Sequence, residues 1–423
     1  MKVFKFGGAS VKSAEAIKNV ASIIRSYPRQ ELVVVFSAMG KTTNALEEVA
    51  FSAYNHKPDL ENKIAVIKDF HQQILDELFQ DAENPVHQLL DGLISNIRAY
   101  CSNTDFGFDE FYDRIVSYGE LISTAIISAW FDETGLKNIL IPAPTLIKTN
   151  DHFRNASVIW QKTGELINLQ IRKTFSENPG HIVITQGFIA GTPEGKRTTL
   201  GREGSDFTAS IFAYCLDAES VTVWKDVDGL LNADPVYFND TRKIGRLSYR
   251  ETIELSFYGA KVLHPKTIKP LQNKNIPLEI KSFYKPHEPG SIIHSSEKSD
   301  NLLPFLILKK KQMLISFSAK DFSFVTEDKL HRLFGVFHLL NIRINLMQNS
   351  AISFTVCIND PGEQISEIIS QLNDEFEIRY NLGLELLTIR HFNEDIVKQH
   401  LCNCEIYLEQ RSRKTIQVAY RKG

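Results

Sequence analysis

Two short apolar stretches near the N-terminus, each followed by a turn and a helical pattern, constrain the fold most. Lys2–Phe6 precedes a Gly-Gly turn, and apolar residues recur at helical spacing over residues 17–24. Leu32–Phe36 is apolar throughout, as strands inside parallel sheets are, and it leads into the polar turn 37–44 and another helix. A strand, turn and helix that repeat in this way predict βαβ units and a parallel sheet.

Further strands are expected at residues 139–141, 181–185 and 221–224, with mostly helical patterns between residues 45 and 130. Each of these strands leads into glycine or polar residues. Because ligands bind outside the carboxyl ends of the strands in open parallel sheets, these turns are where a site is expected.

Residues 198–206, TTLGREGSD, are dense in polar side chains and directly precede an apolar helical pattern. A helix N-terminus offers free backbone N–H groups, and glycines let that backbone approach an anion closely. Arg202 supplies a planar fork for a carboxylate or phosphate, and Asp206 can hold a metal or order a nearby cation. The segment predicts an anion site for a phosphorylated cofactor and an acidic substrate; the alternative is an ordinary capped turn.

Glu120 lies in the segment 118–127, which is apolar on nearly every face and therefore predicts a buried helix. A buried carboxylate needs a partner.

Composition excludes several classes of protein. The chain of 423 residues is long for one core, so two or three domains are expected. Its net charge of −3 provides no basic field for nucleic acid and no polybasic membrane anchor. With neither a signal peptide nor an apolar run of about 20 residues, a cytoplasmic protein is expected.

The five scattered cysteines, Cys402 and Cys404 included, predict reduced thiols rather than zinc ligands.

Composition shifts near residue 286, which indicates a domain boundary. Beyond it, two successive βαββ-type units are expected, and Lys309-Lys310-Lys311 is interpreted as a solvated strand edge. The expected strands are 312–317, 342–346, 351–358, 384–390, 405–409 and 416–420, and the expected helices are 327–340, 363–372 and 393–401.

Two common nucleotide-binding motifs are incomplete in this sequence. Gly40-Lys41-Thr42 lacks the earlier glycine of a phosphate loop, since Val35 stands there, and Gly7-Gly8 does not continue into a dinucleotide fingerprint. Instead, lysines, hydroxyls and a carboxylate follow several strands. Collected at one sheet edge, they could stabilise charge on a transferring phosphoryl group and organise magnesium; these residues are Lys5, Ser37, Thr43, Asp226 and Lys261.

The chain resembles the aspartate kinases over about its first 290 residues, and the remainder resembles the tandem ACT regulatory domains of that family. The motifs that carry the resemblance occur in the family's order: 5–11 (KFGGASV), 118–120 (YGE), 185–188 (TQGF), 198–206, 224–229 (WKDVDG), 234–235 (DP) and 258–265 (YGAKVLHP).

The resemblance implies an α/β amino-acid-kinase fold with a mainly parallel sheet flanked by helices, then two small ferredoxin-like ACT units. The implied domains are a catalytic domain (1–290), a linker (291–308), a first ACT unit (309–382) and a second, shortened unit (383–423). The implied reaction transfers the ATP γ-phosphoryl group, with Mg²⁺, to the side-chain carboxylate of L-aspartate. The product, 4-phospho-L-aspartate, leads toward lysine, threonine, methionine and diaminopimelate.

The resemblance also implies residue roles. No metal is expected to be held by protein side chains alone. The residues with implied catalytic roles are Lys5, Asp206 and Lys261. The residues implied to bind aspartate are Ser37, Thr43, Glu120 and Arg202. The residues implied to bind the nucleotide are Lys5, Gly7, Gly8, Lys225, Asp226, Leu231 and Lys261. Of the aspartate set, Arg202 would take the α-carboxylate and Glu120 the α-ammonium.

Four positions depart from the family pattern: Ala9, Glu203, Leu231 and Val236 stand where threonine, glycine, tyrosine and arginine are usual. They leave one alternative open, a non-catalytic amino-acid sensor with a decayed kinase half. The other alternative is a kinase of the same general sheet architecture that acts on glutamate, acetylglutamate or uridylate, although those kinases lack this combination of motifs with a double ACT tail.

The ACT resemblance implies at least a homodimer and an amino-acid effector. In lysine-inhibited members an aspartate is usual where Asn345 stands, and a glutamate where Ala351 stands. Without these carboxylates, weak inhibition by lysine, or none, is expected.

Overall fold

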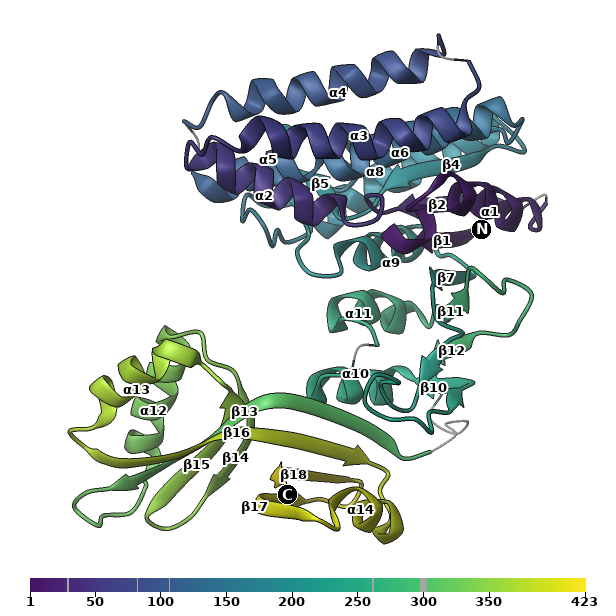
Figure 1. Cartoon of the computed structure of the whole chain (residues 1–423). Coiled ribbons are helices and arrows are strands. Elements are labelled where there is room, and N and C mark those ends of the chain that lie inside the picture. The colour runs from purple at the N-terminus through teal and green to yellow at the C-terminus, as the bar shows by residue number, and fades with distance from the viewer. Residues whose placement is uncertain (29, 82, 106, 261, 297–302) are drawn as a thin grey trace. The chain divides into compact units, whose positions relative to one another are not determined.

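The computed structural model describes residues 1–28, 30–81, 83–105, 107–260, 262–296 and 303–423 (Figure 1). The chain forms two compact units. The first contains residues 1–230, 245–253 and 262–300, and the second contains residues 231–244, 254–261 and 301–423. Two short segments inside the range 1–290 group with the C-terminal unit.

In the described part of the chain, the first unit is built on an eight-stranded sheet of order β10-β12-β11-β7-β1-β2-β4-β3. Every neighbouring pair is parallel except β11 with β12. The expected α/β class with a mainly parallel sheet is confirmed. The strands are β1 (Lys2–Phe6), β2 (Leu32–Phe36), β3 (Asn138–Leu140), β4 (Ile182–Gln186), β7 (Ser220–Lys225), β10 (Arg246–Ser248), β11 (Leu278–Ser282) and β12 (Ser291–His294).

Short strand pairs and helices complete this part of the chain. The pairs are β5 (Ile189–Gly191) with β6 (Arg197–Thr199), and β8 (Leu230–Leu231) with β9 (Lys243–Ile244). The helices are η1 (Gly8–Val11), α1 (Ala14–Arg25), α2 (Thr42–Tyr54), α3 (Leu60–Leu78), α4 (Pro85–Cys101), α5 (Phe108–Val116), α6 (Tyr118–Glu133), α7 (Ala143–Leu146), α8 (Trp160–Glu177), α9 (Gly204–Leu216), α10 (Tyr249–Tyr258) and α11 (Pro265–Lys274). Figure 1 shows α3 and α4 lying along one another.

Strand alternation divides β1 between two faces of the sheet. Phe4 and Phe6 join the large apolar cluster that contains residues of α1 to α6, and Phe6 stacks on Trp224 with ring centroids 5.8 Å apart. Successive side chains of a strand point to opposite faces, so Lys5 lies on the other face. Helix α9 packs against β1, β2 and β7. The alternation of β1 therefore brings one lysine to the start of α9.

The C-terminal unit contains one six-stranded antiparallel sheet in its described part, of order β14-β15-β13-β16-β18-β17. Its two central strands each have 15 residues and pair with each other, so the two expected βαββ units share one sheet. The strands are β13 (Phe305–Ala319), β14 (Ile344–Asn349), β15 (Ser353–Asn359), β16 (Phe376–Arg390), β17 (Cys404–Arg411) and β18 (Thr415–Lys422). The helices are α12 (Glu327–Leu339), η2 (Gly362–Gln364), α13 (Ile365–Leu372) and α14 (Glu394–Leu401).

The interpretation of Lys309-Lys310-Lys311 as a strand edge is wrong. The run lies in the middle of β13, a central strand, where the pairing with β16 shifts register and Lys311 has a φ of 53°. A β-bulge adds residues that cannot alternate regularly, which explains how a lysine run fits here. Lys310 and Lys311 are exposed, but Lys309 is half-buried.

Two further sequence expectations concern cysteines and membranes. All five cysteines, which lie in the described ranges, are free thiols, and three of them are buried. Among the described helices, none combines the length and apolar character that a membrane span requires.

Candidate active site

A cavity of about 510 Å³ lies in the first unit, where β1 and β2 end and α9 begins. Seven of the residues to which the resemblance gives a catalytic or binding role line it: Lys5, Gly8, Ser37, Thr43, Glu120, Arg202 and Asp206. They come from four separate segments of the chain, so the sheet edge gathers residues that are up to 201 positions apart, from 5 to 206.

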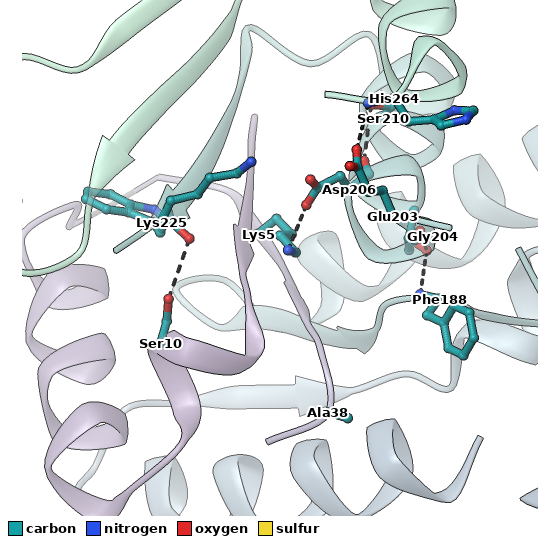
Figure 2. A network of polar contacts seen from close by, with 12 residues as sticks. Lys5, Ser10, Ala38, Phe188, Glu203, Gly204, Asp206, Ser210, Lys225 and His264 are labelled. Atoms are coloured by element: carbon teal, nitrogen blue, oxygen red, sulfur yellow. Dashed lines mark hydrogen bonds and ion pairs between the residues drawn. The ribbon is translucent and has the colours of Figure 1, made fainter. Parts of the chain in front are cut away.

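An ion pair occupies the centre of this site. Lys5 Nζ lies 2.7 Å from Asp206 Oδ1, with the two side chains 11% and 6% exposed (Figure 2). Lys5 is the fourth residue of β1 and Asp206 lies in the first turn of α9. A carboxylate in that turn is also favoured by the helix dipole.

Two lysines keep Asp206 ionised. Burial raises the pKa of its carboxyl, but the charges of Lys5 and Lys225 and the hydrogen bond from Lys5 outweigh this effect, so the pKa lies below its usual value. Lys225 is the last residue of β7, and Figure 2 shows its side chain extending toward the pair. Its Nζ also donates to the carbonyl of Val262 at 3.3 Å. Two lysines and one carboxylate leave a local positive excess that suits an anion.

Glu120 is a buried carboxyl with one unused oxygen. Its Oε1 accepts a hydrogen bond from the Ala38 N–H at 3.2 Å, whereas Oε2 has no hydrogen-bond partner among the residues that the structure describes. Burial raises its pKa to about 8, against the opposing effects of the Ala38 and Glu120 backbone N–H groups and the charge of Lys5. A cation that reached Oε2 would supply the missing partner.

Glycines let the segments around the cavity pack closely. A Cβ on Gly8 would lie 2.7 Å from the carbonyl oxygen of Gly40, and a Cβ on Gly119 would lie 2.8 Å from Cβ of Ala38. Neither position tolerates a side chain without a shift of its neighbours. The turn after β1, the turn after β2 and helix α6 can pack this closely only with glycine there.

The segment 198–206 forms a tight turn into α9. Gly201 and Glu203 have positive φ angles of 77° and 55°. The sequence departure at Glu203 thus places a non-glycine residue in the left-handed region. Its Oε2 accepts a hydrogen bond from the His264 N–H at 2.6 Å (Figure 2), so this carboxylate is partly neutralised by the backbone.

Sequence reasoning missed one wall of the cavity, which contains Glu47, Tyr112 and Arg154. Tyr112 donates a hydrogen bond to Glu47, and the Arg154 guanidinium lies 4.5 Å from the centre of the Tyr112 ring. Asp113, next to Tyr112, holds this wall in place from a buried position. The sequence signal that could have indicated this wall is Asp113, a carboxylate directly after Phe111 and Tyr112 in α5. Glu120 among the apolar residues of α6 is a signal of the same kind.

The other predicted residues are placed as follows. Gly7 adjoins Lys5, whose Nζ would be 3.3 Å from a Cβ at that position. Asp226 follows β7, is exposed and does not line the cavity. Leu231 ends β8 and belongs to the C-terminal unit, and Lys261 lies outside the described residues.

A larger cavity of about 800 Å³ lies within the C-terminal unit, between the segment 232–242 and the sheet, and contains none of the predicted site residues. The described residues contain no group of three or more His, Cys, Asp or Glu side chains that could hold a metal ion.

Known proteins are similar to this chain in both sequence and fold. A sequence model of the Amino acid kinase family matches residues 1–282. Aspartokinase 1, chloroplastic, of Arabidopsis thaliana is 31% identical over 383 residues, which are 87% of this chain and 65% of the plant protein. The chain thus spans slightly less than two thirds of that relative. Lysine-sensitive aspartokinase 3 of Escherichia coli is 30% identical over 361 residues, covering 85% of this chain and 78% of the bacterial protein.

The crystal structure of E. coli aspartokinase III in complex with aspartate and ADP (R-state) is also similar. It has a TM-score of 0.82 at 26% identity, covering 99% of this chain and 96% of that chain. The same protein in complex with lysine and aspartate (T-state) has the same TM-score. The resemblance seen in the sequence motifs is confirmed, and the chain belongs to the amino acid kinase family and, within it, to the aspartokinases.

Proposed function

We propose that the chain is an aspartate kinase that transfers the γ-phosphoryl group of ATP to the side-chain carboxylate of L-aspartate. The bond between the γ-phosphorus and its bridging oxygen breaks, a bond to a carboxylate oxygen forms, and ADP and 4-phospho-L-aspartate leave. The observation that carries the proposal is the unused oxygen of buried Glu120, in one cavity with Arg202 and the Lys5–Asp206 pair.

The charges of the cavity match the substrate. Aspartate carries one ammonium and two carboxylates. Glu120 would take the α-ammonium and Arg202 the α-carboxylate, which leaves the side-chain carboxylate free to react. Both E. coli aspartokinase III structures contain aspartate and one also contains ADP, which supports aspartate and an adenine nucleotide as the substrates of this chain.

Lys5 would stabilise the negative charge that develops on the transferring phosphoryl group, because its ammonium is already fixed at the cavity by Asp206. Ser37 and Thr43 would complete the aspartate site, and the nucleotide would contact Gly7, Gly8, Lys225 and Asp226. The nucleotide roles that the resemblance implies for Leu231 and Lys261 stay predictions. Mg²⁺ would arrive with the nucleotide, because it usually keeps several waters and binds substrate phosphates with only one or two carboxylates.

The test is ATP-dependent formation of an acyl phosphate, trapped with hydroxylamine as the hydroxamate, with and without Mg²⁺. Aspartate should yield the hydroxamate, whereas glutamate, acetylglutamate and uridine monophosphate should not give a phosphorylated product. Turnover of one of these three compounds instead of aspartate would overturn the substrate assignment. Binding of aspartate and ATP without turnover would favour the amino-acid sensor.

We also propose that the chain forms at least a dimer through the C-terminal unit. In this unit Phe322, Phe324 and Leu339 are 82%, 68% and 67% exposed, and β14 is an edge strand of the sheet. Exposed apolar side chains and an unpaired strand edge are both typical of an interface. The molar mass of the wild type and of Phe324→Asp/Leu339→Asp in light scattering tests this: a dimer that becomes a monomer supports it, and a monomeric wild type contradicts it.

A further inference from the structure

We propose that Arg154 is a further substrate-binding residue, which binds the α-carboxylate of the amino-acid substrate together with Arg202. The inference rests on the proposed function, and it concerns a residue that the sequence motifs did not include. Arg154 lies in the connection between α7 and α8 and lines the cavity, and its guanidinium lies over the ring of Tyr112, which lines the same cavity.

The backbone of Arg154 is held in a costly conformation. Its φ is 64°, in the left-handed region that disfavours a residue with a Cβ. Its N–H donates to Oδ2 of buried Asp113 at 2.9 Å. Strained non-glycine residues persist where the surrounding structure fixes them, and they cluster at functional sites. Glycine would adopt this conformation without strain, so the arginine side chain is expected to have a use.

Asp113 also fixes the loop that carries Arg202. The same oxygen, Oδ2, accepts from the Thr199 N–H at 2.8 Å, and Oδ1 accepts from the Thr199 hydroxyl at 2.8 Å. Burial raises the pKa of Asp113 to about 6, against the opposing hydrogen bonds from Arg154 and Thr199. One carboxylate therefore holds both the Arg154 backbone and the start of the segment 199–206.

The two loops touch. A Cβ on Gly201 would lie 3.2 Å from the Arg154 carbonyl oxygen and 2.7 Å from Asn155 Oδ1. Arg154 and Arg202 thus enter one cavity from abutting loops. Two guanidinium groups in one cavity repel each other unless an anion lies between them, and a carboxylate can accept hydrogen bonds from both.

The contacts of the Arg154 side chain fix its position but do not involve all of its hydrogen-bond donors. Its guanidinium stacks on the Tyr112 ring, and Nη1 lies 3.3 Å from Oδ1 of Asp109, in a pair whose side chains are 50% and 63% exposed. An exposed pair of this kind contributes little by itself. A guanidinium has five N–H donors, so donors remain for a substrate carboxylate.

Arg154→Ala tests the proposal through the KM for aspartate. Loss of one charge-assisted contact should raise this KM about tenfold to a hundredfold. The kcat and the KM for ATP should change by less than about twofold, because the α-carboxylate does not react. Arg154→Lys should recover part of the loss. Arg172→Ala, which removes an exposed arginine of α8, is the matched control and should change neither constant.

Arg154→Gly separates binding from structure. It removes the guanidinium and the backbone strain together, so it should melt at or above the wild-type temperature while showing the same rise in KM. An unchanged KM for aspartate in both Arg154→Ala and Arg154→Gly would overturn the proposal.

β-Alanine, which is aspartate without its α-carboxylate, identifies the contacted group. It should inhibit the wild type and Arg154→Ala with equal inhibition constants; a tenfold weaker inhibition of the variant would show that Arg154 contacts another group and overturn the assignment. If the wild type does not phosphorylate aspartate, the proposed function fails separately. In that case, calorimetry of aspartate binding tests the proposal. It requires that Arg154→Ala binds aspartate more weakly than the wild type does. Equal binding by the two proteins, or no binding by the wild type, overturns it.

Discussion

Lys5 in the cavity and Lys309 in the C-terminal sheet are both removed from bulk water, but they have different partners. Lys5 is paired with the carboxylate of Asp206 at 2.7 Å. Lys309 Nζ donates to the amide oxygen of Asn345 at 2.7 Å, and burial, followed by the charge of Arg343, lowers its pKa to about 8. An amide compensates a buried ammonium less than a carboxylate does.

The two surroundings differ in the same way. The side chains that hydrogen-bond to one another around Lys309 are neutral amides: Asn345 Nδ2 donates to Gln312 Oε1 at 2.8 Å and to Asn359 Oδ1 at 2.9 Å. In the cavity, charged groups converge and one carboxyl oxygen of Glu120 is unused. The cavity therefore has charged groups that a charged ligand can pair with, whereas the amides around Lys309 make their hydrogen bonds within the chain.

The largest effect is expected at Lys5. Lys5→Ala should lower kcat by about 10²-fold or more, because its charge is needed most where negative charge develops in the transition state. The KM for aspartate should change far less. Steady-state kinetics measure both, with Lys162→Ala, an exposed lysine of α8, as the control. A wild-type kcat in Lys5→Ala would remove Lys5 from the mechanism.

Glu120→Ala and Arg202→Ala should chiefly raise the KM for aspartate, about tenfold to a hundredfold, because the groups they would bind do not react. Wild-type KM values in both variants would contradict the proposed orientation of the substrate.

The wild-type KM for aspartate should also fall as the pH rises toward 8 and beyond. The Glu120 pKa of about 8 means that the free protein must lose a proton before it binds an ammonium. In Glu120→Gln this pH dependence should disappear; a KM that does not change between pH 6 and 9 in the wild type would argue against it.

A smaller effect is expected from lysine as an effector. The Asn345 side chain already accepts from Lys309 and donates to two amides, and it offers no carboxylate to a free lysine. We expect lysine to inhibit weakly or not at all, in contrast to the lysine-sensitive relative. Initial rates with lysine, threonine and methionine, separately and in pairs, check this. Inhibition by micromolar lysine that Asn345→Ala abolishes would contradict it.

The smallest effect is expected from Lys309→Met, which should leave kcat unchanged and alter only the pH dependence of stability. The folded pKa of about 8 lies below the ordinary value of 10.5, so the unfolded chain binds more protons between these values. The wild type should therefore gain stability relative to Lys309→Met as the pH rises from about 8 to 10.5. Urea unfolding at several pH values measures this, and parallel curves would contradict it.

Much of the sheet and of the site could be predicted because their signals are local. Lys2–Phe6 and Leu32–Phe36 are apolar runs with turns at their ends, and the structure has strands with these bounds. The first half of β16 gave no such signal, because residues 377–383 are mostly exposed and end at a glycine with a φ of 71°. Its pairing with β13 is a long-range property that no local pattern contains.

The site shows the same limit. Motifs indicated Lys5, Glu120 and Asp206, but not that Asp113 joins two loops distant in the sequence. Arg154 was missed because an arginine in a polar connection is normally solvated, and its left-handed backbone depends on Asp113.

The assignment of Glu120 to the substrate ammonium is tested most directly by calorimetry of aspartate binding at pH 7 in buffers of different ionisation enthalpy. Because Glu120 has a pKa of about 8 in the free protein, binding of an ammonium should release up to about one proton from the wild type and none from Glu120→Gln. A binding enthalpy that depends on the buffer in the wild type only is the predicted result. Equal enthalpies in all buffers for the wild type would contradict the assignment.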